Sequence, residues 1–152
     1  MSKPATFTPQ SVAETFWVIR DRVSIQGGVE GAELLIAEVA VPPMGGTPLH
    51  SHASPETMRV LSGELVFLTI ADGTPREFAA RPGDLFTVPA NAPHGYQNRS
   101  GAPARFLAIF DASLRSFFRD VGTVEESHGP PTPPEIDRVF AAARAHGMTL
   151  FV

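Results

Sequence analysis

Three histidines and one glutamate, His50, His52, Glu56 and His94, are spaced so that they could bind one metal ion. Successive residues of a strand face opposite sides, so His50 and His52 point the same way, with Cα atoms about 6.6 Å apart. Glu56 follows where a short turn can bring back the next strand, and His94 must come from a different strand. The chain has no cysteine, so metal ligands must be His, Asp or Glu. Such ligands suit Fe, Ni, Mn, Co, Cu or Zn, and the spacing does not choose among them.

Short apolar runs separated by turn sequences extend from Glu14 to about Phe110, a pattern typical of an all-β sandwich or barrel. Pairs such as Ser62-Gly63 and Asp72-Gly73 indicate tight reversals between these runs. We expect about eight to ten strands in all. The firmest are predicted over residues 15–19, 33–41, 56–61, 64–70, 76–80, 84–88, 94–98 and 104–110.

Two amphipathic helices are predicted after the strands. Apolar residues recur there at helical spacing: Leu114, Phe117, Phe118 and Val121, then Ile136, Val139, Phe140 and Ala143. Ser113 is placed to cap the first helix, and the proline-rich residues 123–134 predict a stiff connector between the two. We therefore expect one domain over residues 1–152, with a barrel over about 14–111 and a helical extension over about 112–152.

Glycine and proline residues around the candidate ligands resemble the two conserved motifs of the cupin superfamily. The first family motif runs Gly, five residues, His-x-His, three or four residues, Glu, six residues, Gly. The His-x-His pair, the glutamate and Gly63 match this motif, whereas Met44 stands at its leading position and the glycine follows one residue later, at Gly45.

The second family motif runs Gly, five residues, Pro-x-Gly, two residues, His, three residues, Asn. Gly83, Pro89, His94 and Asn98 match this motif, and Asn91 replaces its middle glycine. Asparagine adopts positive φ more readily than most residues, so the turn should survive the replacement.

The resemblance covers about residues 40 to 110 and implies a cupin double-stranded β-helix, or jelly-roll, barrel. It also implies that His50, His52, Glu56 and His94 bind one divalent metal ion per chain, and no ligand position is substituted. Residues 114–122, with a Phe-Phe pair after the last strand, look like the tail of bacterial single-domain (cupin 2 type) proteins of the quercetin or flavonol dioxygenase-like group.

A dioxygenase-type oxidoreductase is the first functional hypothesis, in which a small flavonoid, polyphenol or enol-like substrate binds the metal through oxygen and reacts with dioxygen. Glu56 is then the candidate catalytic base. Period two along the strands gives Met58, Tyr96 and Asn98 as candidate substrate-pocket residues, with core packing as the alternative for Met58 and Tyr96. A non-redox isomerase or polyketide-type cyclase, and a module that binds metal or a small ligand without catalysis, stay open.

Composition bears on partners and location. The net charge is −4 and the arginines are scattered, so no basic patch for nucleic acid is expected. No apolar run is long enough to span a bilayer and residues 1–10 lack a signal-peptide pattern, so we expect a cytoplasmic protein without a membrane partner. Phe16 and Trp17, together with the resemblance, predict a homodimer, with core packing as the alternative. His128 is expected in solvent rather than over the pocket as a lid residue, and His146 at a helix end.

Overall fold

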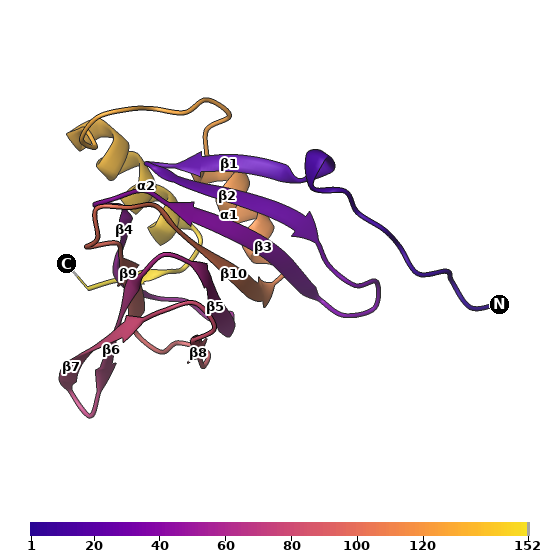
Figure 1. The fold of residues 1–152 in the computed structure, drawn as a ribbon, viewed down its shortest axis with the longest axis horizontal. Coiled ribbons are helices and arrows are strands. Elements are labelled where there is room, and N and C mark those ends of the chain that lie inside the picture. The colour runs from indigo at the N-terminus through magenta and orange to yellow at the C-terminus, as the bar shows by residue number, and fades with distance from the viewer. Residues whose placement is uncertain (152) are drawn as a thin grey trace.

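The computed structural model describes residues 1–151 (Figure 1). A short 3-10 helix, Gln10–Val12, follows an extended N-terminal segment that points away from the body of the protein. The described residues then form these strands: β1 (Glu14–Val18), β2 (Asp21–Gly27), β3 (Leu34–Val41), β4 (Gly46–Ser51), β5 (Glu56–Ser62), β6 (Leu65–Ala71), β7 (Thr74–Ala80), β8 (Leu85–Val88), β9 (His94–Gln97), β10 (Ala104–Asp111) and β11 (Thr149–Leu150). Helices α1 (Leu114–Val121) and α2 (Pro133–Ala145) lie between β10 and β11.

The strands form two antiparallel sheets, which confirms the predicted all-β jelly-roll barrel. One sheet has the order β1-β2-β3-β10-β5-β8 and the other β11-β4-β9-β6-β7. Aromatic contacts join the sheets across the core: Phe106 of β10 packs edge-on against Tyr96 of β9 at 4.9 Å between ring centroids, and Phe67 of β6 lies 6.5 Å from Phe106. The core therefore fills the space between the two sheets.

Burial alternates along the strands that the sequence pattern predicted. In β10, every second residue from Ala104 to Phe110 is buried, and in β5 Met58 and Val60 are buried while Arg59 is exposed. Side chains alternate between the faces of a strand, so this pattern turns one face of each sheet toward the core.

Three of the positive-φ positions lie in the two cupin-like motifs and fix turns there. Asn91 has φ 64°, as expected for a residue that replaces a glycine. Met44 has φ 68° at the leading position of the first motif, and its side chain is exposed, so no packing contact opposes this conformation. Gly63 has φ 74°, and a Cβ atom there would lie 2.6 Å from the Pro103 carbonyl oxygen. Gly63 is thus required both by its φ and by the close approach of the next turn.

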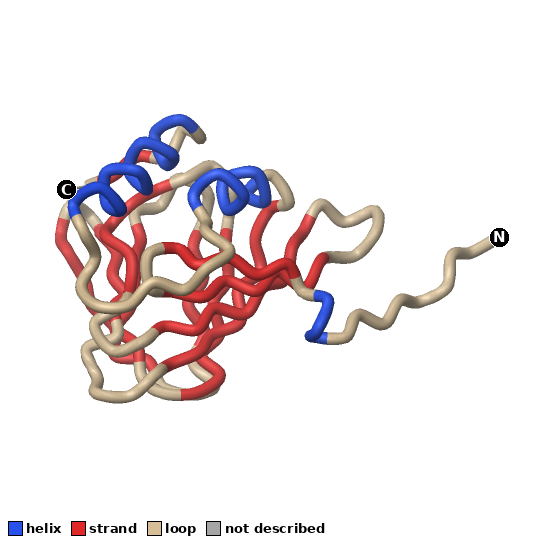
Figure 2. The backbone as a smooth tube through the Cα atoms, turned by 90° about the horizontal axis from the view of Figure 1, so that it is seen from above, coloured by secondary structure: helices blue, strands red, loops and turns tan. Residues whose placement is uncertain are grey.

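Both predicted helices are present and lie on the same side of the barrel (Figure 2). Thr132 and Glu135 form a capping box at the start of α2. The expectation that Ser113 caps α1 is wrong, because its side chain makes no capping hydrogen bond and its own backbone is already helical. Instead the Asp111 carboxylate accepts a hydrogen bond from the Ser113 backbone N–H at 2.8 Å.

The Arg20 side chain holds the end of the connector that leads into α2. The Arg20 guanidinium donates to both oxygens of Glu135 (3.0 and 3.3 Å) and to the carbonyl oxygens of Gly129 (2.7 Å) and Pro130 (3.1 Å). Arg20 lies in the turn between β1 and β2, so this hairpin and the connector are joined although they are far apart in the sequence. His128 in the connector is exposed, as expected.

Three of the eleven strands in residues 1–151 are absent from the eight firmest predictions, although the spacing of His50 and His52 already assumed a strand at β4. β2 has only two apolar residues on its inner face, Val23 and Ile25, and β4 contains Pro48, which argues against a strand in a sequence pattern. β11 has two residues and pairs with β4, where Leu150 is opposite His50. These strands are stabilised mainly by their neighbours in the sheets, which a local pattern does not reveal.

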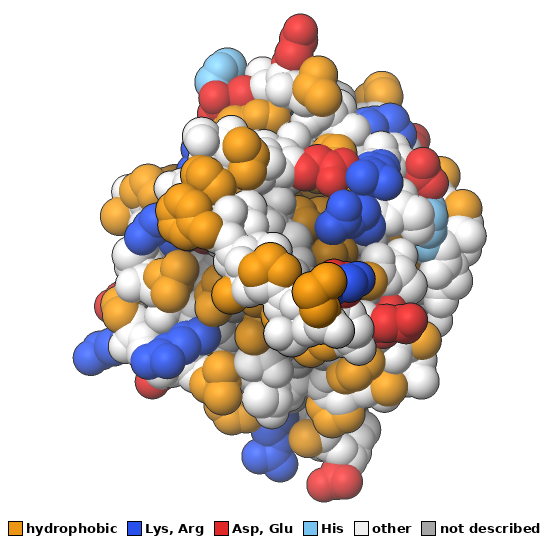
Figure 3. Space-filling model, turned by 90° about the vertical axis from the view of Figure 1, so that its right-hand side faces the viewer, with side chains coloured by type: hydrophobic (Ala, Val, Ile, Leu, Met, Phe, Trp, Pro, Cys, Tyr) orange, Lys and Arg blue, Asp and Glu red, His pale blue; other side chains and the backbone are white. Residues whose placement is uncertain are grey.

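Phe16 is buried in the core, whereas Trp17 is partly exposed and exchanges two backbone hydrogen bonds with Thr123 (2.8 and 2.9 Å). The homodimer stays a prediction. No helix within residues 1–151 is long and apolar enough to cross a bilayer. On the face shown in Figure 3, basic side chains lie among acidic and hydrophobic ones rather than in one basic stripe.

Candidate metal centre

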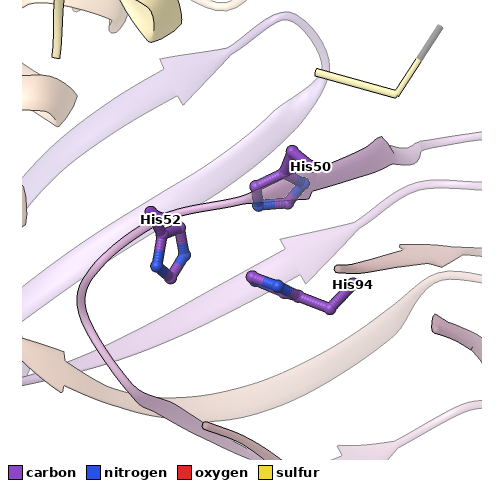
Figure 4. A group of neighbouring side chains, drawn as sticks. All are labelled: His50, His52 and His94. Carbon is purple, nitrogen blue, oxygen red and sulfur yellow. The ribbon is translucent and has the colours of Figure 1, made fainter. Parts of the chain in front are cut away.

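Strand pairing brings the three histidines together. His50 in β4 and His94 in β9 are direct partners in the antiparallel pair, and His52 lies just after β4. The ring centroids are 4.3 Å apart for His50 and His94, 4.7 Å for His52 and His94, and 5.6 Å for His50 and His52. Figure 4 shows the three rings around one common space.

Each ring is oriented by a hydrogen bond from Nδ1 to a backbone carbonyl two residues away. The pairs are His50 with Pro48 (2.8 Å), His52 with Ser54 (2.7 Å) and His94 with Ala92 (2.9 Å). A carbonyl oxygen only accepts, so Nδ1 carries the proton and Nε2 of each neutral ring keeps a free lone pair. Metal-binding histidines are typically oriented in this way: one ring nitrogen donates a hydrogen bond to the protein, and the other is left to bind the metal.

The nitrogen atoms fit a metal ion. One ligand atom from each of His50, His52 and His94 lies within 4.8 Å of the others, so the three rings could hold one ion. Among residues 1–151, Nε2 of His94 is also one of two buried side-chain polar atoms without a hydrogen-bond partner. Buried polar atoms without a partner are rare and costly, and a bound cation would satisfy this one.

Glu56, the first residue of β5, lies beside the histidines. Its Oε2 atom is 3.3 Å from Nε2 of both His52 and His94, but Glu56 is outside the 4.8 Å group that the three histidines form. Burial opposes ionisation of Glu56, yet the His52 and His94 rings, whose Nε2 atoms lie 3.3 Å from its Oε2, outweigh burial and lower the pKa of Glu56 to about 2. The carboxylate is therefore ionised and supplies a negative charge next to the three nitrogens.

The histidines differ in their affinity for protons. Burial, reinforced by the nearby His94, lowers the pKa of His50 to about 4. Burial also disfavours the charged form of His52, but the adjacent Glu56 carboxylate outweighs burial and raises the pKa of His52. At neutral pH the His50 ring is thus neutral, and a cation need not displace a proton from it.

A cavity of about 140 Å³ opens beside the histidines and Glu56. Its wall is mostly apolar and includes Met58, Phe106 and Phe110 from the barrel, Phe118 from α1 and Phe140 from α2. Of the residues 1–151, none that line the cavity is Lys or Arg. An apolar cavity with a few convergent polar groups at one place is typical of a small-molecule site.

Two of the three predicted pocket residues line the cavity, and the third does not. Met58 and Tyr96 line the cavity. Asn98 does not: it is buried elsewhere, its amide donates to the carbonyl oxygens of Val41 (3.0 Å) and Ala102 (2.8 Å), and its Oδ1 accepts from Ser100. The family-like asparagine therefore holds a turn.

One charged residue of the cavity wall, Asp21, was not predicted from the sequence. It follows the turn at Ile19 and Arg20, where an aspartate normally indicates an exposed loop, so no local signal distinguishes it. His146, expected at a helix end, caps α2 and contacts the Asp120 carboxylate at 2.6 Å.

Comparison with known proteins adds family information. Residues 37–110 match the family model described as the cupin domain. Over 60 residues, 40% of this chain, the sequence is 35% identical to a 3-hydroxyanthranilate 3,4-dioxygenase from Xanthomonas campestris pv. campestris. The matched segment spans 34% of the length of that dioxygenase.

Solved structures share the fold. A sugar phosphate isomerase of the cupin superfamily from Silicibacter pomeroyi aligns with a TM-score of 0.58 and 23% identity, covering 70% of this chain and 75% of that one. The polyketide cyclase RemF from Streptomyces resistomycificus aligns with a TM-score of 0.58 and 24% identity over 74% and 80%. Oxalate decarboxylase from Bacillus subtilis, a protein with Mn(II) centres, aligns with a TM-score of 0.58 and 27% identity over 67% and 28%.

Proposed function

Because the chain belongs to the cupin superfamily, we propose that it is a metal-dependent oxidoreductase of the dioxygenase type that acts on a small, oxygen-bearing aromatic or enol-like substrate. The observation that carries the proposal is the position of three histidine Nε2 atoms and one ionised carboxylate beside a single apolar cavity. The partial match to a dioxygenase that acts on an aromatic ring supports the reaction class.

His50, His52 and His94, together with Glu56, would hold one divalent ion, for which Fe, Ni, Mn, Co, Cu and Zn are the candidates. Such an ion supplies Lewis-acid chemistry and, when it is redox-active, oxygen chemistry to a substrate in the cavity. The chain's own contribution is to hold the three rings by their Nδ1 atoms, so that all the Nε2 atoms turn to the same place.

Glu56 is the candidate catalytic base of this proposal. It is ionised, lines the cavity and lies 3.3 Å from Nε2 of His52 and His94, so it is placed to accept the proton of a substrate hydroxyl that enters beside it. Met58 follows Glu56 on the same face of β5 and forms apolar wall, which keeps the ring of the substrate away from water.

Charge and size restrict the substrate. The wall contributes no Lys or Arg from residues 1–151. A phosphate or carboxylate of the substrate that does not bind the metal ion would therefore have no cationic partner. The cavity volume of about 140 Å³ is close to the roughly 150 Å³ of cavities that accept one benzene ring. We therefore favour a substrate with one ring over a three-ring flavonoid.

Metal analysis and oxygen uptake test the proposal. Protein purified without a chelator or a metal-affinity tag should contain about one redox-active ion per chain. With a panel of one-ring phenols and enols, it should consume dioxygen as each substrate disappears. Protein that contains no metal and binds none would overturn the proposal.

Two alternatives give different results in the same assay. A non-redox isomerase or polyketide-type cyclase, for which the apolar cavity and the ionised Glu56 would also suffice, should turn over with Zn(II) under nitrogen. A module that binds metal or a small ligand without catalysis should bind these compounds and form no product under air or under nitrogen. Either result would contradict the dioxygenase proposal.

A further inference from the structure

Asp21 is a buried acid in an apolar part of the cavity wall. Its side chain lines the cavity next to Val18, Ile19 and Val23, and the residue is only 4% exposed. Burial raises its pKa to about 7, although the hydrogen bond from Tyr96 opposes this change. A carboxylate in such surroundings destabilises the folded protein unless hydrogen-bond donors surround it.

Only part of the hydrogen-bonding capacity of Asp21 is used. The Tyr96 hydroxyl donates to Oδ2 at 2.7 Å, whereas Oδ1 has no hydrogen-bond partner within residues 1–151. Gly45 packs next to Oδ1, and a Cβ atom at that position would come within 2.8 Å of it. An ionised carboxylate can accept about four hydrogen bonds, so neither oxygen of Asp21 is saturated: Oδ1 is buried beside Gly45, and Oδ2 accepts only from Tyr96.

Tyr96 connects this acid to the proposed metal centre. It follows His94 by two residues in β9, so the two side chains are on the same face with Cα atoms about 6.6 Å apart. Its ring packs edge-on against Phe106, which fixes the position of the hydroxyl group. The single hydroxyl proton is used on Asp21, so with Asp21 ionised the pair offers only acceptors.

We propose that Asp21, held by Tyr96, is the specificity-determining residue of the cavity and accepts a hydrogen bond from a hydroxyl or amino group of the ligand. The ligand class is a single ring that carries metal-binding oxygens on one side and a hydrogen-bond donor on another. This inference rests on the proposed function, because it assumes that the ligand is anchored at the histidines.

A purely structural role for Asp21 and a role in ligand binding predict different effects of Asp21→Asn on stability. If the Asp21–Tyr96 bond only joined β2 to β9, removal of the charge should leave the protein equally stable or less stable. If the acid is kept for a ligand, Asp21→Asn should raise the melting temperature of the ligand-free protein near pH 8, because the variant buries no charge and can still accept from Tyr96.

Two matched probes test ligand recognition. 3,4-Dihydroxybenzyl alcohol and 4-ethylcatechol share the same metal-binding oxygens and nearly the same size, but only the alcohol carries an additional donor. Their 3-substituted isomers cover the other orientation of the ring. Binding is measured under nitrogen, near pH 8, from the visible spectrum of the Co(II)-loaded protein.

The wild type should bind an alcohol at least about tenfold more tightly than its ethyl partner, in at least one of the two orientations. Asp21→Asn should lose this preference and keep its affinity for the ethyl compounds and for Co(II). Asp72→Asn, the same chemical change in the exposed turn between β6 and β7, should keep the preference.

The outcomes separate the two proposals. A Co(II) spectrum that responds to none of the four probes, or no Co(II) binding, would contradict the proposed function itself. Probes that bind without preference in the wild type, or with a preference that survives in Asp21→Asn, would overturn the role of Asp21 and leave the metal centre intact.

Discussion

Replacing Asp21 by Asn should stabilise the protein, and the gain should grow with pH. Burial raises the pKa of Asp21 from 3.8 to about 7. The folded protein then binds this proton more tightly than the unfolded chain does. The stabilisation that this bound proton gives to the folded state is complete below pH 3.8 and is lost as the pH rises through about 7. The shift of about 3 pH units (7 − 3.8), at about 1.36 kcal/mol per unit, corresponds to a loss of about 4 kcal/mol above the folded-state pKa.

Urea unfolding of the wild type and of Asp21→Asn, in a buffer that contains a chelator, measures this difference. Asparagine does not titrate. The free energy of unfolding of the variant should therefore exceed that of the wild type by about 2 kcal/mol near pH 5 and by about 4 kcal/mol near pH 8. Contributions from the histidines are common to both proteins and cancel. A difference that stays constant with pH would refute the burial of an ionised carboxylate, and a less stable variant near pH 8 would show that folding requires it.

Three further predictions concern the metal centre, a turn and the connector. His94→Ala should weaken metal binding by more than about 100-fold in a chelator competition, because loss of a residue that only hydrogen-bonds to a metal ligand already lowers metal affinity by about 10 to 100-fold. His128→Ala should leave metal affinity unchanged. Gly63→Ala should lower the free energy of unfolding by at least about 2 kcal/mol more than Gly73→Ala does. Both glycines have positive φ, but only at Gly63 would the new Cβ meet backbone atoms. Arg20→Gln should speed amide hydrogen exchange in residues 128–135 severalfold; unchanged exchange would show that its hydrogen bonds do not hold the connector.

Much of the barrel could be predicted because its information is local. Strands such as β5 and β10 alternate buried and exposed residues, so period two in the sequence is enough to find them. The turn at Asn91 was predictable for the same reason, since positive φ depends on the residue type itself. The convergence of the three histidines also followed from spacing and resemblance, and the strand register brings His50 opposite His94.

Other features depend on contacts between distant segments. β4 contains Pro48 and still forms a strand, because β9 and β11 pair with its two sides. Met44 adopts positive φ although its residue type disfavours it, and its N–H donates to the Asn98 carbonyl oxygen at 2.9 Å. Asp21 is the clearest case, because only the folded chain shows that an aspartate beside a turn is buried against a tyrosine from another sheet.

The part of the chain that matches the cupin model explains why metal binding is easier to infer than the substrate. All four predicted ligands lie within residues 37–110, which that model matches. Much of the cavity wall lies outside this range: Asp21 belongs to the first hairpin, Phe118 to α1 and Phe140 to α2. Proteins with the same four ligands can therefore differ in every one of these wall positions. If substrate choice depends on those elements, exchanging α1 and α2 for those of another cupin should change which probes bind, while affinity for Co(II) stays the same.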